Sequence, residues 1–549
     1  MNGFVPWPPE LARDYRKRGI WKGIPLGEAL DTAAREHGGR VAVVDVKRSL
    51  TFTELRDQAR RLASSFIALG ICDGARVVLQ LPNTAEFAVV YLAALKVGAV
   101  PIACLPHHRQ AEIQALANLA EAHAWIMAPR HRAFDCLAMA RSLAPEIPSI
   151  QHLVIVGDEE HDGASSVVAL VARGSADDPA LARHVPDAAI PAILQLSGGT
   201  TGTSKLIPRT HDDYLYNCLA FAEATGFTGE DVLLVPIPIA HNFPLACPGL
   251  QAALLLGART VLAESPAASA VFPLAARERA TWIPAVPATL MQWTQDPTRT
   301  SYDLSSIKSI YVGGQRLNPE AARAAVAAFG PVVRQVFGMA EGLLCATRPA
   351  DDIEIHMETQ GRPVCELDEL RIVDEGDHEV AIGELGELQC RGAYTIRGYY
   401  RAHEHNKAAF TADGFYRTGD MVRRHPSGNL VVEGRKKDLI NRGGEKISAE
   451  EIEGLIMKHG SVANVALVAI PDAVLGERAC ACVVLNEGAA LSLPALVAFL
   501  RDEQRIASFK LPERLEIFQS FPLTGVGKVS KKDLRSLVSD RLSAVTSAG

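Results

Sequence analysis

The sequence predicts an α/β protein with a large N-terminal domain of layered α/β subdomains, a small β-rich subdomain and a small mobile α+β C-terminal domain. Short apolar runs alternate with helical patterns along the first part of the chain, which predicts a mostly parallel sheet with helices on its faces. From about Glu366 the pattern changes to short strands and turns, and the charged segment 434–438 separates these from a compact C-terminal unit. We therefore predict domains over residues 1–437 and 438–549.

The first elements set the strand–helix alternation. Residues 41–46 and 76–81 are apolar runs of strand length, and residues 86–95 follow the second with helical periodicity. Between the two strands, Thr53 is the expected N-cap of a helix. Its apolar face carries Leu55, Ala59, Leu62, Phe66 and Leu69.

Later segments repeat the pattern. Further strands are expected at residues 192–196, 231–235, 259–262, 307–312, 332–336, 369–373, 386–390, 465–470 and 479–485. In the C-terminal unit, Ser448 and Glu451 have the spacing of a capping box that opens a helix. Another helix is expected to begin near Pro494, because proline is well tolerated in a first helical turn.

Composition and charge indicate a globular enzyme of the cytoplasm. The net charge of −7 gives no electrostatic reason to expect nucleic acid or an anionic membrane as a partner. No secretory signal is visible at the start, and the apolar stretch 87–105 is interrupted by Lys96, Gly98 and Pro101, which favours a core helix and strand over a membrane span. The 10 cysteines lack metal-ligand spacing, as expected in a reducing cytoplasm.

A stretch rich in glycine and hydroxyl side chains follows the run 192–196. It comprises Ser197, Gly198, Gly199, Thr200, Thr201, Gly202, Thr203, Ser204 and Lys205. Glycine allows close backbone approach, hydroxyl and N–H groups donate hydrogen bonds, and lysine adds positive charge, a combination suited to phosphate oxygens. A flexible surface loop has the same composition, and the spacing is not that of a Walker A loop. Composition leaves both interpretations open.

Four further motifs follow in order. They are Phe-Gly-Met-Ala-Glu at 337–341, Tyr-Arg-Thr-Gly-Asp at 416–420, Gly-Arg-Lys-Lys-Asp at 434–438 and Pro-Leu-Thr-Gly-Val-Gly-Lys at 522–528. Together with the loop, they resemble the motifs of the adenylate-forming superfamily, which includes acyl-CoA synthetases, luciferases and adenylation domains of nonribosomal peptide synthesis. Ala340 stands where that family usually has threonine. The resemblance covers nearly the whole chain and implies activation of a carboxylic acid by ATP, with pyrophosphate as the leaving group.

The resemblance also implies nucleotide-binding roles. The hydroxyls of the loop and Lys205 would hold the β- and γ-phosphates, and Glu341 would help to hold Mg²⁺, which prefers oxygen ligands. Asp420 would accept hydrogen bonds from the ribose hydroxyls, assisted by Arg435. The adenine side would be formed by Gly314, Gln315, Arg316, Val336, Phe337 and Gly338.

Lys528 matches the catalytic lysine of the family. A lysine among glycines near a C-terminus is normally a solvated turn residue, but the motif around it reverses that expectation. It would bridge the substrate carboxylate and the α-phosphate. Asp438 would be the hinge about which the C-terminal domain turns, removing Lys528 and bringing in the loop at 443–444 for thioester formation.

The segment that contains His241, Asn242 and Phe243 resembles the acid pocket of stand-alone aryl-acid adenylating enzymes of siderophore pathways, which activate 2,3-dihydroxybenzoate or salicylate. The resemblance implies that Asn242 hydrogen-bonds the ortho hydroxyl, that Phe243 packs on the ring, and that Gly313 and Gly314 leave a flat slot. An amino-acid-activating domain would carry an aspartate here to pair with the ammonium group, a charge that Asn242 cannot supply. The alternative is that His241 and Asn242 form an ordinary polar turn with no role in substrate binding.

Two positions favour salicylate over 2,3-dihydroxybenzoate. Cys247 lies where dihydroxybenzoate enzymes resemble one another in having serine, and Leu344 where they carry valine. A thiol behaves much like a small hydrophobe, and leucine adds volume, so both changes disfavour a 3-hydroxyl. An apolar pocket rejects an added hydroxyl by only about a hundredfold, so some activity on the dihydroxy acid is expected.

The acceptor of the acyl group is expected to be a separate molecule, because Gly549 follows Lys528 too closely for a carrier domain. By resemblance it is the phosphopantetheine thiol of an aryl carrier protein; an aryl-CoA ligase, with coenzyme A as acceptor, is the alternative. A catalytically inactive adenylate-binding sensor is a remote alternative, because the five charged residues of the catalytic set are present: Lys205, Glu341, Asp420, Arg435 and Lys528. No nucleic-acid or membrane partner is expected.

Overall fold

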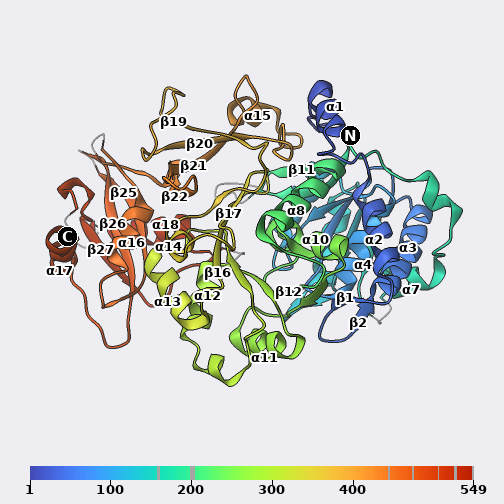
Figure 1. Ribbon diagram of the computed structural model, residues 1–549, viewed down its shortest axis with the longest axis horizontal. Coiled ribbons are helices and arrows are strands. Elements are labelled where there is room, and N and C mark those ends of the chain that lie inside the picture. Colours follow the sequence, from blue (N-terminus) through green and yellow to red (C-terminus); the bar gives the residue numbers. More distant parts are fainter. Residues whose placement is uncertain are drawn as a thin grey trace.

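The computed structural model describes residues 1–157, 161–197, 204–442, 445–472, 475–504, 506–524 and 528–546. Figure 1 shows the N-terminal part of the chain, in blue and cyan, at one end of the molecule and the C-terminal part, in orange and red, at the other. The elements in yellow and green lie between them. The α/β fold class is confirmed, with its β-rich subdomain and small C-terminal α+β unit, whereas the boundary at 437/438 and the mobility of that unit stay predictions.

A sheet of nine strands forms the middle of the molecule, in the order β18-β17-β16-β15-β14-β12-β13-β1-β2. Its parallel centre consists of β1 (Val41–Val44), β12 (Val232–Val235), β13 (Arg259–Leu262), β14 (Trp282–Ala285), β15 (Ser309–Val312) and β16 (Val333–Gly338). Antiparallel strands close both edges: β2 (Ser49–Thr51), β17 (Leu344–Ala346) and β18 (Arg362–Pro363).

A second sheet has seven strands in the order β11-β10-β4-β3-β5-β8-β9. Its strands are β3 (Arg76–Gln80), β4 (Val100–Ala103), β5 (Ala124–Met127), β8 (His152–Ile155), β9 (Ser165–Ser166), β10 (Pro191–Leu196) and β11 (Leu206–Thr210). All pairs are parallel except β10 with β11, which form a hairpin. A separate two-stranded ribbon contains β6 (Arg130–His131) and β7 (Phe134–Asp135). The alternation of strands and helices therefore builds two largely parallel sheets, where the sequence predicted one.

Two smaller sheets follow. The antiparallel sheet β19-β20-β21-β22 comprises β19 (Glu369–Val373), β20 (Gly386–Arg391), β21 (Tyr416–Arg424) and β22 (Leu430–Arg435). The C-terminal sheet contains β23 (Ile440–Arg442), β24 (Glu445–Ile447), β25 (Val462–Asp472), β26 (Gly476–Leu485) and β27 (Arg514–Phe518).

Helices cover the sheets. In the N-terminal half they are α1 (Pro9–Lys17), α2 (Leu26–His37), α3 (Phe52–Ala68), α4 (Ala85–Lys96), α5 (Gln110–Ala120), α6 (Cys136–Leu143), α7 (Val167–Arg173), α8 (His211–Thr225), α9 (Asn242–Ala246) and α10 (Gly249–Leu256). In the rest of the chain they are α11 (Ala268–Glu278), α12 (Pro287–Gln295), α13 (Pro319–Phe329), α14 (Ile353–Glu358), α15 (His403–Ala409), α16 (Ala449–Ile456), α17 (Leu493–Ala498) and α18 (Lys531–Thr546). Across the described ranges, none of these helices has the length and apolar character needed to cross a membrane.

One predicted helix start and one predicted capping box need correction. The N-cap of α3 is Thr51, not Thr53, because Thr51 forms a capping box with Glu54. At α16, Ser448 caps the helix as expected, but the reciprocal bond of the predicted capping box is absent from the structure as described. The Glu451 carboxylate instead accepts from Lys510 Nζ at 2.6 and 2.8 Å.

One hydrophobic core joins the two large sheets and supports the site. It packs α3, α4, α8 and α10 against strands of both sheets, and it includes Tyr214, Phe243, Cys247, Val336 and Leu344. These five side chains come from α8, from α9 and the residue after it, and from the neighbouring strands β16 and β17. Burial of this apolar surface holds together the elements that carry the residues predicted to form the acid pocket.

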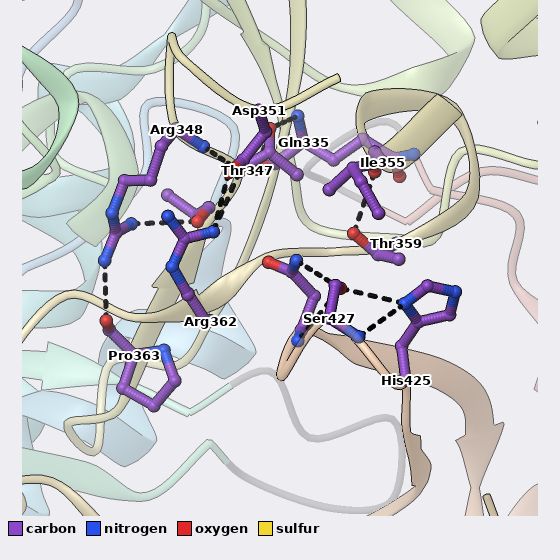
Figure 2. A network of polar contacts seen from close by, with 12 residues as sticks. Gln335, Thr347, Arg348, Asp351, Ile355, Thr359, Arg362, Pro363, His425 and Ser427 are labelled. Atoms are coloured by element: carbon purple, nitrogen blue, oxygen red, sulfur yellow. Dashed lines mark hydrogen bonds and ion pairs between the residues drawn. The ribbon is translucent and has the colours of Figure 1, made fainter. Parts of the chain in front are cut away.

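A polar network fixes the sheet edge that carries Leu344. Figure 2 shows Arg362 pointing at Asp351, to whose two carboxylate oxygens its Nη1 donates at 2.8 and 3.0 Å. The neighbouring Arg348 donates from Nη2 to the carbonyl oxygen of Pro363 at 2.6 Å. These bonds tie β17 to β18 and so hold the backbone from which Leu344 extends.

Candidate active site

The two ends of the glycine-rich loop lie side by side. The N–H of Ser197 donates to the carbonyl oxygen of Lys205 at 3.0 Å, and the N–H of Lys205 donates to Ser197 Oγ at 2.9 Å. These bonds continue the β10–β11 hairpin. Residues 198–203, which the sequence assigned to phosphate binding, lie outside the described residues. The Lys205 ammonium lies 5.8 Å from the centroid of the Tyr399 ring.

Glu341 is held by the same tyrosine. The Tyr399 hydroxyl donates to Glu341 Oε1 at 2.7 Å and lies 2.7 Å from the hydroxyl of Tyr416. The N–H of Ile396 donates to the main-chain oxygen of Glu341 at 2.8 Å. Lys205 and Glu341, from motifs far apart in sequence, therefore meet around Tyr399, which sequence reasoning did not single out.

Asp420 and Arg435 are cross-strand neighbours on β21 and β22. Arg435 Nε lies 2.7 Å from Asp420 Oδ1, and Arg435 Nη1 donates to the carbonyl oxygen of Thr418 at 3.0 Å. Burial raises the pKa of Asp420 to about 6, while Arg435 acts in the opposite direction. The register of one antiparallel hairpin thus brings together the two residues predicted at the ribose.

Lys528 lies over the loop that follows β15. A Cβ placed on Gly314 would lie 3.1 Å from Lys528 Cε and 3.4 Å from its Nζ. Thr524 fixes the turn, because its Oγ1 accepts from the N–H of Lys528 at 3.1 Å. Burial lowers the pKa of Lys528 to about 8; Arg435 lowers it further, whereas Asp420 and Glu450 raise it. The lysine therefore belongs to the same electrostatic cluster as the Asp420–Arg435 pair.

His241 caps the short helix α9. Its Nδ1 accepts from the N–H of Phe243 at 3.2 Å. Burial lowers the pKa of His241 to about 4, and the charge of Lys528 acts in the same direction. The imidazole is therefore neutral near pH 7.

Asn242 is anchored at both ends of its amide. The Tyr214 hydroxyl donates to Asn242 Oδ1 at 2.8 Å, and Asn242 Nδ2 donates to Cys247 Sγ at 3.5 Å. Burial raises the pKa of the Cys247 thiol to about 12, so the sulfur is neutral near pH 7. The sequence predicted Asn242 and Cys247 in one pocket but not their contact, nor the part of Tyr214.

Two glycines leave room for the pocket walls. A Cβ on Gly313 would lie 2.6 Å from Val336 Cγ1 and 3.4 Å from Phe243 Cε1. A Cβ on Gly338 would lie 2.5 Å from Leu344 Cδ2. Phe243, Val336 and Leu344 therefore pack directly on the backbone of these glycines.

The residues predicted on the adenine side differ in their exposure and in the direction of their side chains. Gly314 and Gln315 are exposed and Phe337 is half-buried. Arg316 turns to β22, where its Nη1 donates to Glu433 Oε2 at 2.8 Å and to the carbonyl oxygen of Val432 at 3.1 Å. The adenine-side role of these residues stays a prediction.

Contacts also reach the site from the C-terminal unit. Asp438 Oδ1 accepts from Arg535 Nη2 of α18 at 2.5 Å, and Glu450 of α16 approaches Gly434, with 3.4 Å between its Cδ and a Cβ placed on that glycine. Burial raises the pKa of Glu450 to about 7. No local pattern identifies Glu450, because only the docking of α16 on β22 brings it to the site. Residues 443–444, predicted to act in thioester formation, lie outside the described residues.

The chain matches known proteins over most of its length. Residues 30–400 match the model of the AMP-binding enzyme family, and residues 451–528 match that of the AMP-binding enzyme C-terminal domain. A salicylyl-CoA synthase / salicylate adenylyltransferase of Streptomyces sp is 48% identical over 550 residues, with 99% of each chain covered. The 2,3-dihydroxybenzoate-AMP ligase of Bacillus subtilis (strain 168) is 44% identical, again with 99% of each chain covered. The solved apo structure of Mycobacterium smegmatis MbtA has a TM-score of 0.74 and 43% identity, covering 97% of this chain and 98% of its own.

Proposed function

The chain belongs to the AMP-binding enzyme family, and from that membership we propose that it uses ATP to activate an aryl acid, with salicylate as the first substrate and 2,3-dihydroxybenzoate as the second. A carboxylate oxygen of the acid attacks the α-phosphorus of ATP and forms a new oxygen–phosphorus bond. The bond to pyrophosphate breaks, leaving an aryl-adenylate. The acyl group then passes to a thiol, and AMP leaves.

One observation supports this function most directly: Lys528 lies against Gly314, within the electrostatic cluster of Asp420 and Arg435 and beside His241. Its ammonium group would neutralise the charge that accumulates as one anion attacks another. Positioning and charge stabilisation are the main contributions an enzyme makes to such a transfer.

Lys205 and Glu341 suit the phosphate end of the nucleotide. Lys205 follows the glycine-rich loop and supplies positive charge for the β- and γ-phosphates, which the hydroxyls of that loop would also contact. Glu341 offers a carboxylate, the donor type that Mg²⁺ takes, and Tyr399 holds one of its oxygens. When bound, Mg²⁺ would neutralise part of the phosphate charge. Asp420 and Arg435 would hold the ribose.

The choice of acid follows from the pocket. Asn242 provides one polar contact among apolar walls, as an aryl acid with an ortho hydroxyl requires. Cys247 and Leu344 favour salicylate because a thiol and a larger apolar side chain leave less room and fewer partners for a 3-hydroxyl. One of the two relatives is named for salicylate and the other for 2,3-dihydroxybenzoate, which supports an aryl acid with an ortho hydroxyl as the substrate class.

The acceptor is the thiol of a phosphopantetheine arm, carried by a separate aryl carrier protein. Coenzyme A, which ends in the same arm, is the second candidate, and the name of the Streptomyces relative, a salicylyl-CoA synthase, favours it. Asp438 is the proposed hinge at the boundary of domains 1–437 and 438–549, and its ion pair with Arg535 would stabilise the arrangement in which Lys528 faces Gly314.

The first half-reaction is tested by ATP–pyrophosphate exchange with salicylate, 2,3-dihydroxybenzoate and benzoate. We expect salicylate-dependent exchange in the wild type and a loss of at least about a hundredfold in Lys528→Ala, the size of effect that a lost transition-state contact produces. Lys532→Ala, an exposed lysine of α18, is the matched control and should retain activity. Absence of exchange with every aryl acid would favour an adenylate-binding sensor.

The acceptor is tested by incubating enzyme, ATP and salicylate with either coenzyme A or a phosphopantetheinylated aryl carrier protein, and weighing the thioester by mass spectrometry. Faster transfer to the carrier supports the first candidate. Faster transfer to coenzyme A supports the second.

A further inference from the structure

We propose that Tyr214 is a positioning residue which, together with Gln195, fixes the Asn242 amide as a hydrogen-bond donor, so that the pocket selects aryl acids with an ortho oxygen over those with an ortho amino group. This inference rests on the proposed function, because it assumes that the acid binds beside Asn242. It concerns two buried residues that no sequence motif identified.

Gln195, Tyr214 and Asn242 form a chain of hydrogen bonds, and a backbone carbonyl sets the direction in which its members donate. Gln195 Nε2 lies 3.4 Å from the main-chain oxygen of Ala240 and 3.1 Å from the hydroxyl oxygen of Tyr214. A carbonyl oxygen only accepts, so the Gln195 atom facing it is the amide nitrogen, which then also donates to Tyr214. The single hydroxyl hydrogen of Tyr214 is thereby directed at Asn242 Oδ1, 2.8 Å away.

This directionality decides which way the Asn242 amide faces. Because Oδ1 accepts from Tyr214, the amide nitrogen must lie on the opposite side, where it donates to Cys247 Sγ at 3.5 Å. An amide nitrogen carries two hydrogens. Within the ranges that the structure describes, the second hydrogen has no acceptor, so it is left for a ligand.

The surroundings prevent the donors and acceptors of this hydrogen-bond chain from exchanging roles. Gln195, Tyr214 and Asn242 are all buried. The carbon of the Arg209 guanidinium lies 4.6 Å from the centroid of the Tyr214 ring, and Arg209 donates to Asp213 at 2.7 Å. Rotation of the ring would disturb this buried ion pair, whose separation is costly. Burial also raises the pKa of Tyr214, so its hydroxyl hydrogen is retained.

Local structure explains how Tyr214 reaches its position. Thr210 and Asp213 form a capping box that starts α8 immediately after β11. The first turn of α8 therefore follows the strand of the phosphate loop without a linker. Arg209 extends the connection by donating from Nη1 to the carbonyl oxygen of Ala340 at 2.9 Å, next to Glu341. Tyr214 is thus fixed by the same elements that carry Lys205 and Glu341.

The chemistry of the ortho group follows from this orientation. The hydroxyl of salicylate donates its hydrogen to its own carboxylate, which leaves an oxygen lone pair to accept from Asn242. The ortho amino group of anthranilate also bonds its own carboxylate, but its second N–H would face the N–H of Asn242. Two donors facing each other leave both unpaired, and a buried unpaired donor weakens binding by roughly 10- to 100-fold.

Tyr214→Phe tests the inference, because it removes the hydroxyl and keeps the ring. We expect kcat/KM for salicylate to fall about tenfold, mostly through KM, while benzoate, which lacks an ortho group, changes less than about twofold. The salicylate-to-anthranilate ratio should fall as well. Tyr216→Phe is the matched control: it lies on the same helix, but its hydroxyl contacts Cys365 Sγ at 2.9 Å. The salicylate-to-anthranilate ratio of kcat/KM in Tyr216→Phe should equal that of the wild type.

Asn242→Asp supplies an independent measurement, since it replaces the donor by an acceptor of the same shape. The salicylate-to-anthranilate ratio of kcat/KM should fall by at least about tenfold. An equal loss for salicylate and benzoate in Tyr214→Phe would reduce Tyr214 to a structural residue and overturn the inference. An unchanged ratio in Tyr214→Phe would do the same. Failure of the proposed function looks different: the wild type would then show no exchange with any aryl acid.

Discussion

The side chain of Lys528, from the C-terminal unit, lies over Gly314 in the loop after β15: the lysine Nζ lies 3.4 Å from the point where a Cβ on Gly314 would stand. Gly314 has a φ of +88°, a conformation that glycine adopts without strain. The backbone conformation therefore favours glycine, and a larger residue would also crowd the end of the docked Lys528 side chain.

Gly314→Ala should push the end of the Lys528 side chain aside by a few tenths of an ångström and lower the rate of ATP–pyrophosphate exchange by roughly two- to tenfold, because a full 1 Å misplacement reduces a rate by about a hundredfold. Gly330→Ala is the matched control, since Gly330 has a φ of +82° but nothing within 4 Å of a Cβ. Its φ is also positive, so an alanine there is strained as well, but its Cβ would meet no neighbour. Equal losses in both variants would attribute the effect to strain alone.

The pH dependence of kcat/KM for exchange should be bell-shaped, with limbs near pH 6 and pH 8. Burial raises the pKa of Asp420 to about 6, so below that pH the carboxyl is protonated and becomes a weaker acceptor for the ribose hydroxyls. Burial lowers the pKa of Lys528 to about 8, so above that pH the ammonium loses its charge. Because kcat/KM reports the free enzyme, both limbs belong to the unliganded site. Lys528→Arg should shift the basic limb upward; a basic limb that stays in place would show that another group causes it.

The double variant Cys247→Ser/Leu344→Val should relax the preference for salicylate. A serine hydroxyl offers a stronger hydrogen-bonding partner than the thiol, and valine makes room, so the ratio of kcat/KM for 2,3-dihydroxybenzoate to that for salicylate should rise about tenfold. Removing a methylene beside Gly338 should also cost about 1 kcal/mol of unfolding free energy. Leu343→Val, a buried neighbour that packs into a different core, is the control and should leave the ratio unchanged. A wild-type preference for the dihydroxy acid would contradict the assignment of salicylate.

Glu341→Gln should raise the Mg²⁺ concentration needed for half-maximal exchange, because an amide is a weaker ligand for a hard cation than a carboxylate. Tyr399→Phe should produce a smaller shift in the same direction, since Tyr399 only orients Glu341 Oε1. Titrating exchange with Mg²⁺ measures both effects. Glu404→Gln, an exposed carboxylate on α15, serves as the control. Identical Mg²⁺ curves for Glu341→Gln and the wild type would remove Glu341 from the metal site.

The start of α3 gives a test of stability. Thr51→Ala should lower the free energy of unfolding by about 1 kcal/mol, because it removes the side chain that accepts from the N–H of Glu54. Thr53→Ala should have a much smaller effect, since Thr53 lies within the first turn of the helix and is exposed. Thermal unfolding of the two variants, compared with the wild type, separates the two caps. A larger loss for Thr53→Ala would favour the cap expected from sequence.

Much of the fold was predictable because it depends on short-range patterns. The strands at 259–262 and 369–373 have the predicted bounds, since apolar runs of that length between turns have few alternatives. Most other strands and helices differ at an end, where hydrogen bonding to neighbours decides the last residue. The prediction of Thr53 was wrong because both Thr51 and Thr53 have side chains that can cap a helix. Glu54 lies three residues after Thr51, so the capping box forms at Thr51.

The order of the motifs, the strand–helix alternation, and the charged and hydroxyl residues predicted to bind a nucleotide could all be read from the sequence. Tertiary structure alone decided that Tyr399 joins Lys205 to Glu341, that Glu450 reaches Gly434, and that Tyr214 orients Asn242. Local periodicity and capping depend on residues a few positions apart. These contacts join segments far apart in the chain, so they arise only when the sheets pack against one another and their buried polar groups must find partners.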